Sequence, residues 1–287
     1  MSVSLAGRSL HEPSSAQLRH RVSVAGVDFD ALTEQEVVTE VRDALGRNAG
    51  GRIITPNVDI LRLIAGSPRV RAHVDDASIV VADGMPVVWA SHIAGGRRRG
   101  LPERVAGSSL IWSLCAVCAV DGHRVFLLGG APGSPGVPSG AQRAAAVLGL
   151  RYPRLKVAGC LSPAYGFESD PARRAAILAD VVEAKPDLVL VGLGFPKQEQ
   201  IIDALRPDLP GAWFMGCGAS INFVIGDERR APRWMQRSGL EWAHRLAQEP
   251  RRLGPRYLRH DLPYAVSLLG RSALTRLASK IPATSQN

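Results

Sequence analysis

The sequence lacks any apolar run of the length that a membrane-spanning helix requires. About 18 to 20 consecutive apolar residues are needed to cross a bilayer, and no apolar segment approaches that length. Residues 1–21 also lack the apolar stretch of a signal peptide and show no periodicity. We therefore expect a protein that stays in the cytoplasm, with residues 1–21 as a mobile leader.

Cysteine is scarce, with four in 287 residues. Cys115 and Cys118 form a CxxC pair, but no second pair with zinc-site spacing exists, and residues 110–120 are typical of a buried helix. Cys160 and Cys217 also lie in apolar surroundings. We therefore predict core thiols without structural disulfides, in keeping with a reducing compartment.

A dinucleotide fingerprint is missing after the first predicted strand, where Gly26-Val27-Asp28 stands in place of GxGxxG. This argues against a Rossmann-type oxidoreductase or nucleotide-sugar epimerase. A later glycine-rich turn, residues 129–133, leads from a predicted strand into a helix. The backbone N–H groups of Gly129 and Gly130 could contact phosphate or ribose there, and a plain tight turn explains the glycines equally well.

Positive charge is concentrated near the end of the chain. Residues 229–280 hold twelve Lys and Arg against three Asp and Glu, a surplus of nine that equals the formal net charge of +9. The rest of the chain is neutral. A neutral body with a basic segment indicates an anionic partner, which could be a phosphorylated ligand, an acidic membrane surface or nucleic acid.

Short apolar segments alternate with helical patterns up to about residue 227, which predicts an α/β fold with a doubly wound, mostly parallel sheet. The expected strands are residues 22–27, 52–54, 79–81, 123–128, 155–158, 187–191 and 212–215. We expect a catalytic domain over residues 22–227 and a basic helical appendage over 228–270. Residues 271–287 are predicted to form a disordered tail.

Two polar clusters follow neighbouring predicted strands. Thr55-Pro56-Asn57 comes after the strand at 52–54, and Ala82-Asp83-Gly84 comes after the strand at 79–81. Parallel strands present their carboxyl ends at one edge of a sheet, where α/β proteins place ligands. A carboxylate, a hydroxyl and a carboxamide are therefore expected to share one rim and form a reaction site.

Asp28-Phe29-Asp30 has the DxD spelling found in the metal sites of many sugar-nucleotide transferases. It lies at the entry to a helix that Thr33 and Glu36 open as a capping box. We favour the capping explanation over a metal site.

Several motifs in fixed order resemble the WecG/TagA/CpsF family, glycosyltransferase family 26. Beside the two polar clusters, they are Val105-Ala106-Gly107, Leu127-Leu128-Gly129-Gly130, Pro196-Lys197-Gln198-Glu199, Arg230-Ala231-Pro232, Leu240-Glu241-Trp242, Glu249-Pro250 and Arg256-Tyr257. The resemblance covers roughly residues 22 to 260.

This resemblance implies a compact Rossmann-like fold of the GT-E class and an inverting, metal-independent hexosyltransferase without a cofactor. The donor would be a UDP-sugar, carrying N-acetylmannosamine, its uronic acid, glucose or a related sugar. The acceptor would be a polyprenyl-diphosphate-linked saccharide, used in cell-surface polysaccharide or teichoic-acid assembly. The sequence identifies neither the sugar nor the pathway.

The family match assigns roles to residues of the two polar clusters. Asp83 matches the proposed base, and Thr55 and Asn57 match residues that line the same pocket. Inverting transfer is a single displacement that needs one base for the acceptor hydroxyl, which a carboxylate at a strand end can supply. Helix capping remains the alternative for both Asp83 and Asn57.

Further substrate contacts follow from the same match. Gln198, at the start of its helix, has the donors and the acceptor that uracil, ribose or sugar hydroxyls need. Where relatives usually carry Asp, this chain has Asn222, so donor preference can differ. Arg245, Arg252 and Arg256 match arginines thought to fold over the pocket and neutralise a diphosphate, with a solvated basic face as the alternative.

The basic appendage also contains apolar side chains, which suits peripheral attachment to the inner face of the membrane. They are Leu240, Trp242, Leu246, Leu253, Tyr257, Leu258 and Tyr264. An undocked appendage would leave apolar surface that fits either membrane docking or a homo-oligomer. A nucleic-acid-binding protein is the weaker alternative, because no known nucleic-acid motif is present and the neutral body would be unexplained.

Overall fold

The computed structural model describes residues 19–226, 231–232, 234–235 and 239–278, and the account below concerns these residues. The predicted leader up to residue 18, the junction at 227–230 and the end of the chain from 279 lie outside them. Arg19 already belongs to the folded body, because its guanidinium donates to the Ser78 carbonyl at 2.7 Å and pairs with Glu40 at 2.5 Å.

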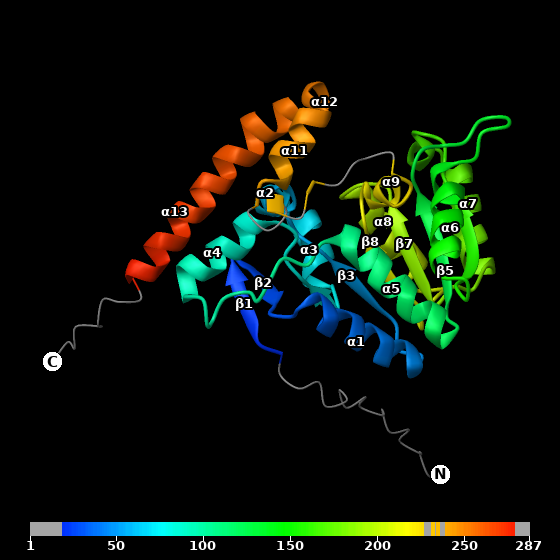
Figure 1. Ribbon diagram of the computed structural model, residues 1–287, viewed down its shortest axis with the longest axis horizontal. Helices are drawn as coiled ribbons and strands as arrows, with labels where there is room; N and C mark the ends of the chain where they lie inside the picture. The colour runs from blue at the N-terminus through cyan, green and yellow to red at the C-terminus, as the bar shows by residue number, and fades with distance from the viewer. Residues whose placement is uncertain (1–18, 227–230, 233, 236–238, 279–287) are drawn as a thin grey trace, which may run out of the picture.

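Six parallel strands form the central sheet in the order β4-β3-β8-β7-β5-β6, which confirms the predicted fold class (Figure 1). The strands are β3 (Gly51–Ile54), β4 (Ile79–Val80), β5 (Arg124–Gly129), β6 (Lys156–Leu161), β7 (Leu188–Gly192) and β8 (Trp213–Gly216). They match the predicted strands within a few residues. Nearly continuous apolar sequence in β5 and β7 reflects burial on both faces, as expected for central parallel strands.

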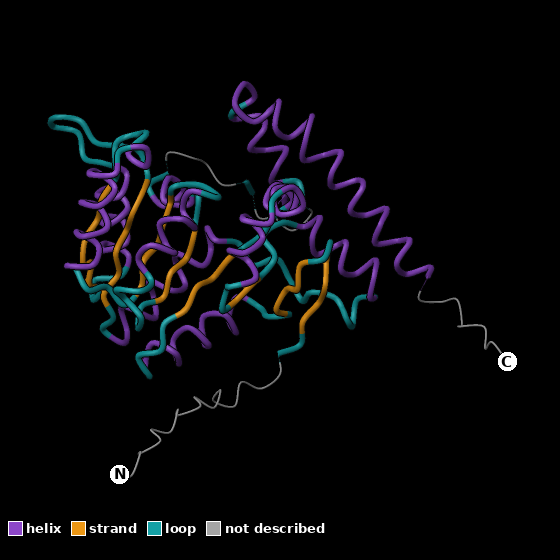
Figure 2. The backbone as a smooth tube through the Cα atoms, turned by 180° about the vertical axis from the view of Figure 1, so that it is seen from behind, coloured by secondary structure: helices purple, strands orange, loops and turns teal. Residues whose placement is uncertain are grey.

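Helices cover both faces of this sheet, as seen from behind in Figure 2. One apolar cluster contains buried residues of α1 (Glu34–Gly46), α5 (Gly107–Asp121), α6 (Gly140–Arg151) and α9 (Ser220–Val224). A second contains buried residues of α7 (Pro171–Glu183) and α8 (Lys197–Leu205). Successive strand residues alternate between them: Leu127 and Leu190 join the first cluster, whereas Phe126 and Val189 join the second.

The segment predicted as one strand at 22–27 is instead half of a β-hairpin, formed by β1 (Arg21–Val24) and β2 (Val27–Asp30). Ala25 and Gly26 both have positive φ, at 54° and 75°, and make the turn between the antiparallel strands. The hairpin is a separate two-stranded sheet beside the edge strand β4, where the Asp30 carboxylate accepts a hydrogen bond from the Val80 N–H at 2.8 Å. The predicted capping box of Thr33 and Glu36 at the start of α1 is confirmed.

Three further helices pack around the hairpin end of the sheet: α2 (Val58–Gly66), α3 (Pro68–Asp75) and α4 (Met85–Gly95). They share a third apolar cluster with the hairpin and with α13 (Leu262–Ala278), the long helix that crosses α4 in Figure 1. The other described pieces of the appendage are α11 (Glu241–Gln248), α12 (Pro250–Arg256) and the π-helix η2 (Tyr257–Asp261).

The chain stays helical across the boundary predicted at residue 270, because α13 continues to Ala278. Leu268 before this boundary and Ser272 after it are both buried, so the helix has a packing partner on this face. Short-range sequence patterns do not reveal this partner, because it is α4, which lies far away in the chain.

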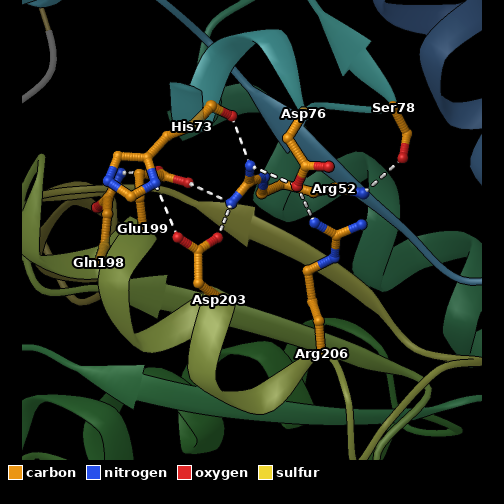
Figure 3. A network of polar contacts seen from close by, with 8 residues as sticks. All are labelled: Arg52, His73, Asp76, Ser78, Gln198, Glu199, Asp203 and Arg206. Carbon is orange, nitrogen blue, oxygen red and sulfur yellow. Dashed lines mark hydrogen bonds and ion pairs between the residues drawn. The ribbon is translucent and has the colours of Figure 1, made fainter. Parts of the chain in front are cut away.

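A fully buried arginine ties β3 to helices on the same face of the sheet (Figure 3). The Arg52 guanidinium pairs with Asp203 of α8 and with Asp76 at 3.1 Å, and donates to the His73 carbonyl at 2.5 Å. Glu199, also buried, has a carboxylate oxygen 3.9 Å from the Arg52 Nη1. Charges buried in this way persist only when partners replace the lost hydration.

A cavity of about 500 Å³ opens beside this network, lined among others by Gly50, Asp76, Asp203 and Arg206. It lies at the amino edge of the sheet, where β3 and β8 begin, and thus opposite to the two polar clusters. Its charged side chains pair with one another or with Arg52, which makes them part of the buried network.

We predict that Arg52→Met lowers the free energy of unfolding by about 3–5 kcal/mol, because it removes the buried partner of Asp203, Asp76 and the His73 carbonyl and breaks a buried polar network. Urea unfolding followed by circular dichroism measures the change. Arg206→Met is the matched control, since Arg206 pairs with Asp76 at the surface, where such a pair contributes at most about 1 kcal/mol. Equal losses for the two variants would contradict the importance of the buried network.

Candidate active site

The two predicted polar clusters meet at the carboxyl edge of the sheet. β3 pairs in parallel with β4, with Ile54 opposite Val80, so Thr55-Pro56-Asn57 and Ala82-Asp83-Gly84 leave the sheet side by side. The Asp83 N–H donates to the Pro56 carbonyl at 3.1 Å and fixes the two turns together.

Within this rim, Thr55 and Asn57 have different surroundings. Thr55 is buried, whereas Asn57 is half-buried and caps α2, with Oδ1 accepting from the Ile60 N–H at 3.0 Å. The capping explanation for Asn57 is therefore correct, and the cap uses only the oxygen of its carboxamide.

Asp83 is half-buried and does not cap the following helix. The cap position of α4 belongs to Gly84, and no side chain donates or accepts there. The catalytic role of Asp83 stays a prediction.

An arginine that no sequence motif singled out lies next to Asp83. The Val105 N–H donates to the Ala82 carbonyl at 2.9 Å, which brings Arg104 beside the β4 turn. Burial lowers the pKa of the Arg104 guanidinium, but the carboxylates of Asp83 and Glu241 raise it by more, so the net shift is upward. Arg104 is therefore a fixed positive charge at the site.

The turn after β8 forms a further wall of the site. Gly107, the first residue of α5, lies between this turn and Thr55: a Cβ on Gly107 would come within 3.8 Å of the Ser220 Oγ and 3.7 Å of the Thr55 Oγ1. The two hydroxyls therefore face the same small region at the start of α5. Ser220 was not predicted as a site residue.

Gln198 stabilises the turn after β8 through its side-chain hydrogen bonds. Its side chain is buried, its Oε1 accepts from the Gly218 N–H at 3.0 Å, and its Nε2 donates to the Glu199 carboxylate at 3.1 Å (Figure 3). The carboxamide thus connects the turn to Glu199 and onward to Arg52. These contacts make Gln198 a positioning residue for the turn, whereas its predicted contact with substrate stays a prediction.

Gly129 ends β5 and Gly130 follows it, two strands away from β8 in the sheet. Both have positive φ, and a Cβ on Gly129 would lie 2.3 Å from the Gly192 carbonyl oxygen. A Cβ on Gly130 would come within 3.1 Å of the Gly140 Cα. Backbone packing therefore requires both glycines, and phosphate or ribose contact at this turn stays a prediction.

The appendage reaches the site through α11. The Arg245 guanidinium lies over the Phe223 ring, 5.1 Å from its centroid, and Phe223 follows Asn222 in α9. The Asn222 Oδ1 is buried and has no hydrogen-bond partner among the described residues. Arg245 and Asn222 are thus brought to one region, and their contacts with substrate stay predictions.

Arg256 has a different environment from the one expected. Its guanidinium lies 3.6 Å from Asp59 of α2 and 3.4 Å from Asp261, and Arg62 contacts the same two carboxylates at 2.6 and 3.7 Å. This cluster of two arginines and two aspartates holds the appendage against α2. The predicted contact of Arg256 with a diphosphate stays a prediction, and the side chain of Arg252 lies outside the described ones.

The DxD spelling does not form a pair of metal ligands. Asp28 is exposed, whereas Asp30 is buried and accepts from Arg21 at 3.0 Å as well as from the Val80 N–H. Within the described ranges, no three His, Cys, Asp or Glu side chains gather closely enough to hold a metal ion.

The four cysteines are free thiols, and those of α5 lie in the core as predicted. Burial raises the pKa of Cys118 to about 12 and that of Cys115 well above its ordinary value. Neither is a thiolate at neutral pH.

Arg104 and Glu241 form a pair that the sequence patterns did not reveal. Their side chains are 14% and 15% exposed and form an ion pair between the α/β body and α11, although they are 137 positions apart. Arg104 directly precedes the Val105-Ala106-Gly107 motif and Glu241 lies inside Leu240-Glu241-Trp242. The only sequence signal for these two residues was their position beside the motifs. That they pair with each other can be known only from the folded structure.

A parallel α/β sheet whose strand ends collect a carboxylate, hydroxyls and an arginine is typical of an enzyme that acts on a small polar ligand. A sequence model described as "Glycosyl transferase WecG/TagA/CpsF family" matches residues 22–278. The chain therefore belongs to this glycosyltransferase family.

Two proteins from Staphylococcus aureus, of strains MW2 and NCTC 8325 / PS 47, are among its relatives. Each is named N-acetylglucosaminyldiphosphoundecaprenol N-acetyl-beta-D-mannosaminyltransferase. Each is 29% identical to the chain over 236 residues, which is 82% of this chain and 87% of the relative. The similarity thus extends over nearly the whole length of both proteins.

Glu199 gives a testable pH dependence of stability. Burial raises its pKa to about 7 despite the opposing effect of Arg52, whereas the unfolded value is about 4.5. The folded state therefore keeps a proton that the unfolded state loses between these values, so stability falls as pH rises through about 7.

We expect the free energy of unfolding of wild type, relative to Glu199→Gln, to decrease between pH 5 and 8 by up to about 3 kcal/mol. Urea unfolding at several pH values measures this difference. The exposed Glu183→Gln is the control for a neutralised surface carboxyl. The opposite result would be a wild type that becomes more stable, relative to Glu199→Gln, as pH rises. It would mean that the fold stabilises Glu199 as the anion and would contradict the prediction.

Proposed function

We propose that the protein transfers a hexose-type sugar from a UDP-sugar to a polyprenyl-diphosphate-linked saccharide, with inversion at the anomeric carbon. The observation that carries the proposal is that Asp83 and Arg104 stand on adjoining segments at the carboxyl edge, joined by the hydrogen bond from the Val105 N–H to the Ala82 carbonyl, in a chain of this glycosyltransferase family. The names of the S. aureus relatives support N-acetylmannosamine as donor sugar and a diphosphoundecaprenol-linked N-acetylglucosamine as acceptor.

In the proposed reaction, Asp83 accepts the proton of an acceptor hydroxyl, and the oxygen attacks the anomeric carbon. A new glycosidic C–O bond forms while the bond between that carbon and the diphosphate oxygen breaks. The electron pair leaves with UDP, whose growing negative charge a nearby guanidinium can stabilise. Arg104 and Arg245 are the described arginines at the site that suit this role, so the proposed reaction requires no metal ion.

Thr55, Ser220 and the Nδ2 group of Asn57 are suited to hydrogen-bond the sugar rings. These groups border the region beside Asp83, and hydroxyl and amide groups match sugar hydroxyls as donors and acceptors. Asn222, with its unsatisfied Oδ1, is suited to donate or accept for the nucleoside.

We also propose that the appendage attaches the enzyme to the inner face of the cell membrane. Of the apolar residues considered in the sequence, Leu253 and Tyr257 are buried and cannot contact lipid in this arrangement. Tyr264 packs on the body and donates to the Leu61 carbonyl at 3.3 Å. Leu240, Trp242 and Leu258 stay exposed.

The outer face of η2 and α13 supplies a larger apolar surface. Five exposed side chains fall on one side of the helix, opposite or beside the face that packs on α4. They are Leu258, Leu262, Val266, Leu274 and Leu277. Arg259, Arg271 and Arg276 accompany them, which suits anionic lipid. Among the described residues, no helix combines the length and hydropathy needed to cross a bilayer.

We predict that Asp83→Asn lowers acceptor-dependent transfer at least about a hundredfold, because general base catalysis typically contributes that much or more. The assay measures UDP release with a panel of UDP-sugars and a short-chain polyprenyl-diphosphate-linked N-acetylglucosamine acceptor in detergent. Binding of UDP should be retained. Asp28→Asn, which neutralises the exposed aspartate of the DxD spelling, is the control and should keep full activity.

Retention of transfer by Asp83→Asn would overturn the assignment of the base. Failure of the wild type to bind any uridine nucleotide would overturn the proposed donor class.

We predict that Leu277→Glu weakens binding to anionic liposomes at least about tenfold, because it removes a leucine from the apolar face and adds a negative charge. Co-sedimentation with phosphatidylglycerol vesicles at low salt measures the affinity. Leu150→Glu is the matched control, since Leu150 is 85% exposed but lies on α6, at the opposite end of the molecule from α13 (Figure 1). Equal weakening by both variants would contradict docking through α13.

A further inference from the structure

We propose that Glu241 of the appendage is a positioning residue that holds Arg104 beside Asp83, so that docking of α11 sets the electrostatic environment of the base. This inference rests on the proposed function, because it concerns the same carboxylate. It assigns a role to Glu241 that goes beyond closing the site.

The contact is largely, but not fully, removed from solvent at the junction of the two parts of the protein. Arg104 and Glu241 are 14% and 15% exposed, and their side chains form both a hydrogen bond and an ion pair. Surface ion pairs contribute little, but a pair removed from water fixes the geometry of both side chains because losing either partner leaves an uncompensated charge. Glu241 therefore restricts where the Arg104 guanidinium can lie.

Arg104 is shared between carboxylates. Asp83 from the β4 turn, Glu241 from α11 and Glu34 from α1 are the charged groups that act on it among the described residues. Glu34 is also held by Ser113, whose hydroxyl donates to it at 2.5 Å. Loss of Glu241 would free the guanidinium from its direct ion pair and remove a negative charge that offsets it.

This sharing matters for a general base. A guanidinium that pairs fully with Asp83 would stabilise the carboxylate and lower its pKa, which makes it a weaker proton acceptor. With Glu241 in place, part of the Arg104 charge is compensated, and Asp83 keeps a higher affinity for the proton. With the appendage undocked, Arg104 would be released toward Asp83, so the base would be least effective before the site is complete.

The inference makes two predictions of opposite sign for the pH dependence of kcat/KM. Glu241→Gln should move the acid limb of the profile to lower pH, because the negative charge of Glu241 no longer offsets the positive charge of Arg104. Arg104→Gln should move it to higher pH, because a positive charge near Asp83 is removed. We expect shifts of about one pH unit in each direction. If the ion pair had a purely structural role, both variants would lose activity, and their acid limbs would stay at the pH of the wild type.

The double variant tests whether Glu241 acts through Arg104. In the Arg104→Gln background, Glu241→Gln should shift the limb much less than it does in the wild type, because the two changes belong to one interaction. Glu249→Gln removes another appendage carboxylate and is the control, with an unchanged acid limb expected. Full additivity in the double variant would overturn the proposed route through Arg104.

A second measurement covers variants with too little turnover. The carboxyl ¹³C resonance of Asp83, assigned by its absence in Asp83→Asn, reports the titration of the base in the full-length protein without any reaction. A lower midpoint in Glu241→Gln than in wild type supports the inference, and an equal or higher midpoint overturns it.

The outcome is distinguishable from a failure of the proposed function. Full transfer activity of Asp83→Asn would remove the base itself. Loss of transfer in Asp83→Asn together with an unmoved acid limb in Glu241→Gln would remove only the role of Glu241.

Discussion

The parallel pairing of β3 with β4 on one side and β8 on the other is the constraint on which the site depends. It brings three turns, after Ile54, Val80 and Gly216, to one edge of the sheet without any contact between their side chains being needed. The Asp83 N–H to Pro56 carbonyl bond then fixes two of these turns, and Gln198 fixes the third through Gly218. The reactive groups are thus positioned by backbone geometry, which does not depend on their own side chains.

The buried network around Arg52 extends this support to the opposite edge of the sheet. Arg52 contacts helix α8 through Asp203 and Glu199, and Glu199 in turn receives a hydrogen bond from Gln198. A chain of polar contacts therefore joins the start of β3 to the turn after β8. Because each buried charge needs its partner, this chain tolerates little movement of α8 relative to the sheet.

Sequence patterns were sufficient for the parts of the fold that depend on local order. The strand and helix alternation, the polar clusters at strand ends and the capping box of Thr33 all follow from residues within a few positions of each other. The hairpin was missed because Val22 to Val27 reads as one β-branched strand, and only the positive φ of Ala25 and Gly26 divides it. Contacts over long separations, such as Arg104 with Glu241 and α13 with α4, have no local pattern and require the folded chain.

The basic appendage divides its charge between docking and exposed surface. Arg256 is compensated by Asp59 and Asp261, and two acidic groups of the appendage contact the body: Glu241 pairs with Arg104, and Asp261 pairs with Arg62. Undocking would separate Arg256 from Asp59 and would also expose the buried Leu268, whose transfer to water costs about 1.5–3 kcal/mol. Apolar burial therefore supplies most of the free energy that holds the appendage on the body. The ion pairs determine the position in which the appendage binds. Such a division suits the two roles proposed for the appendage, which are to hold charges at the site and to present an apolar face outward.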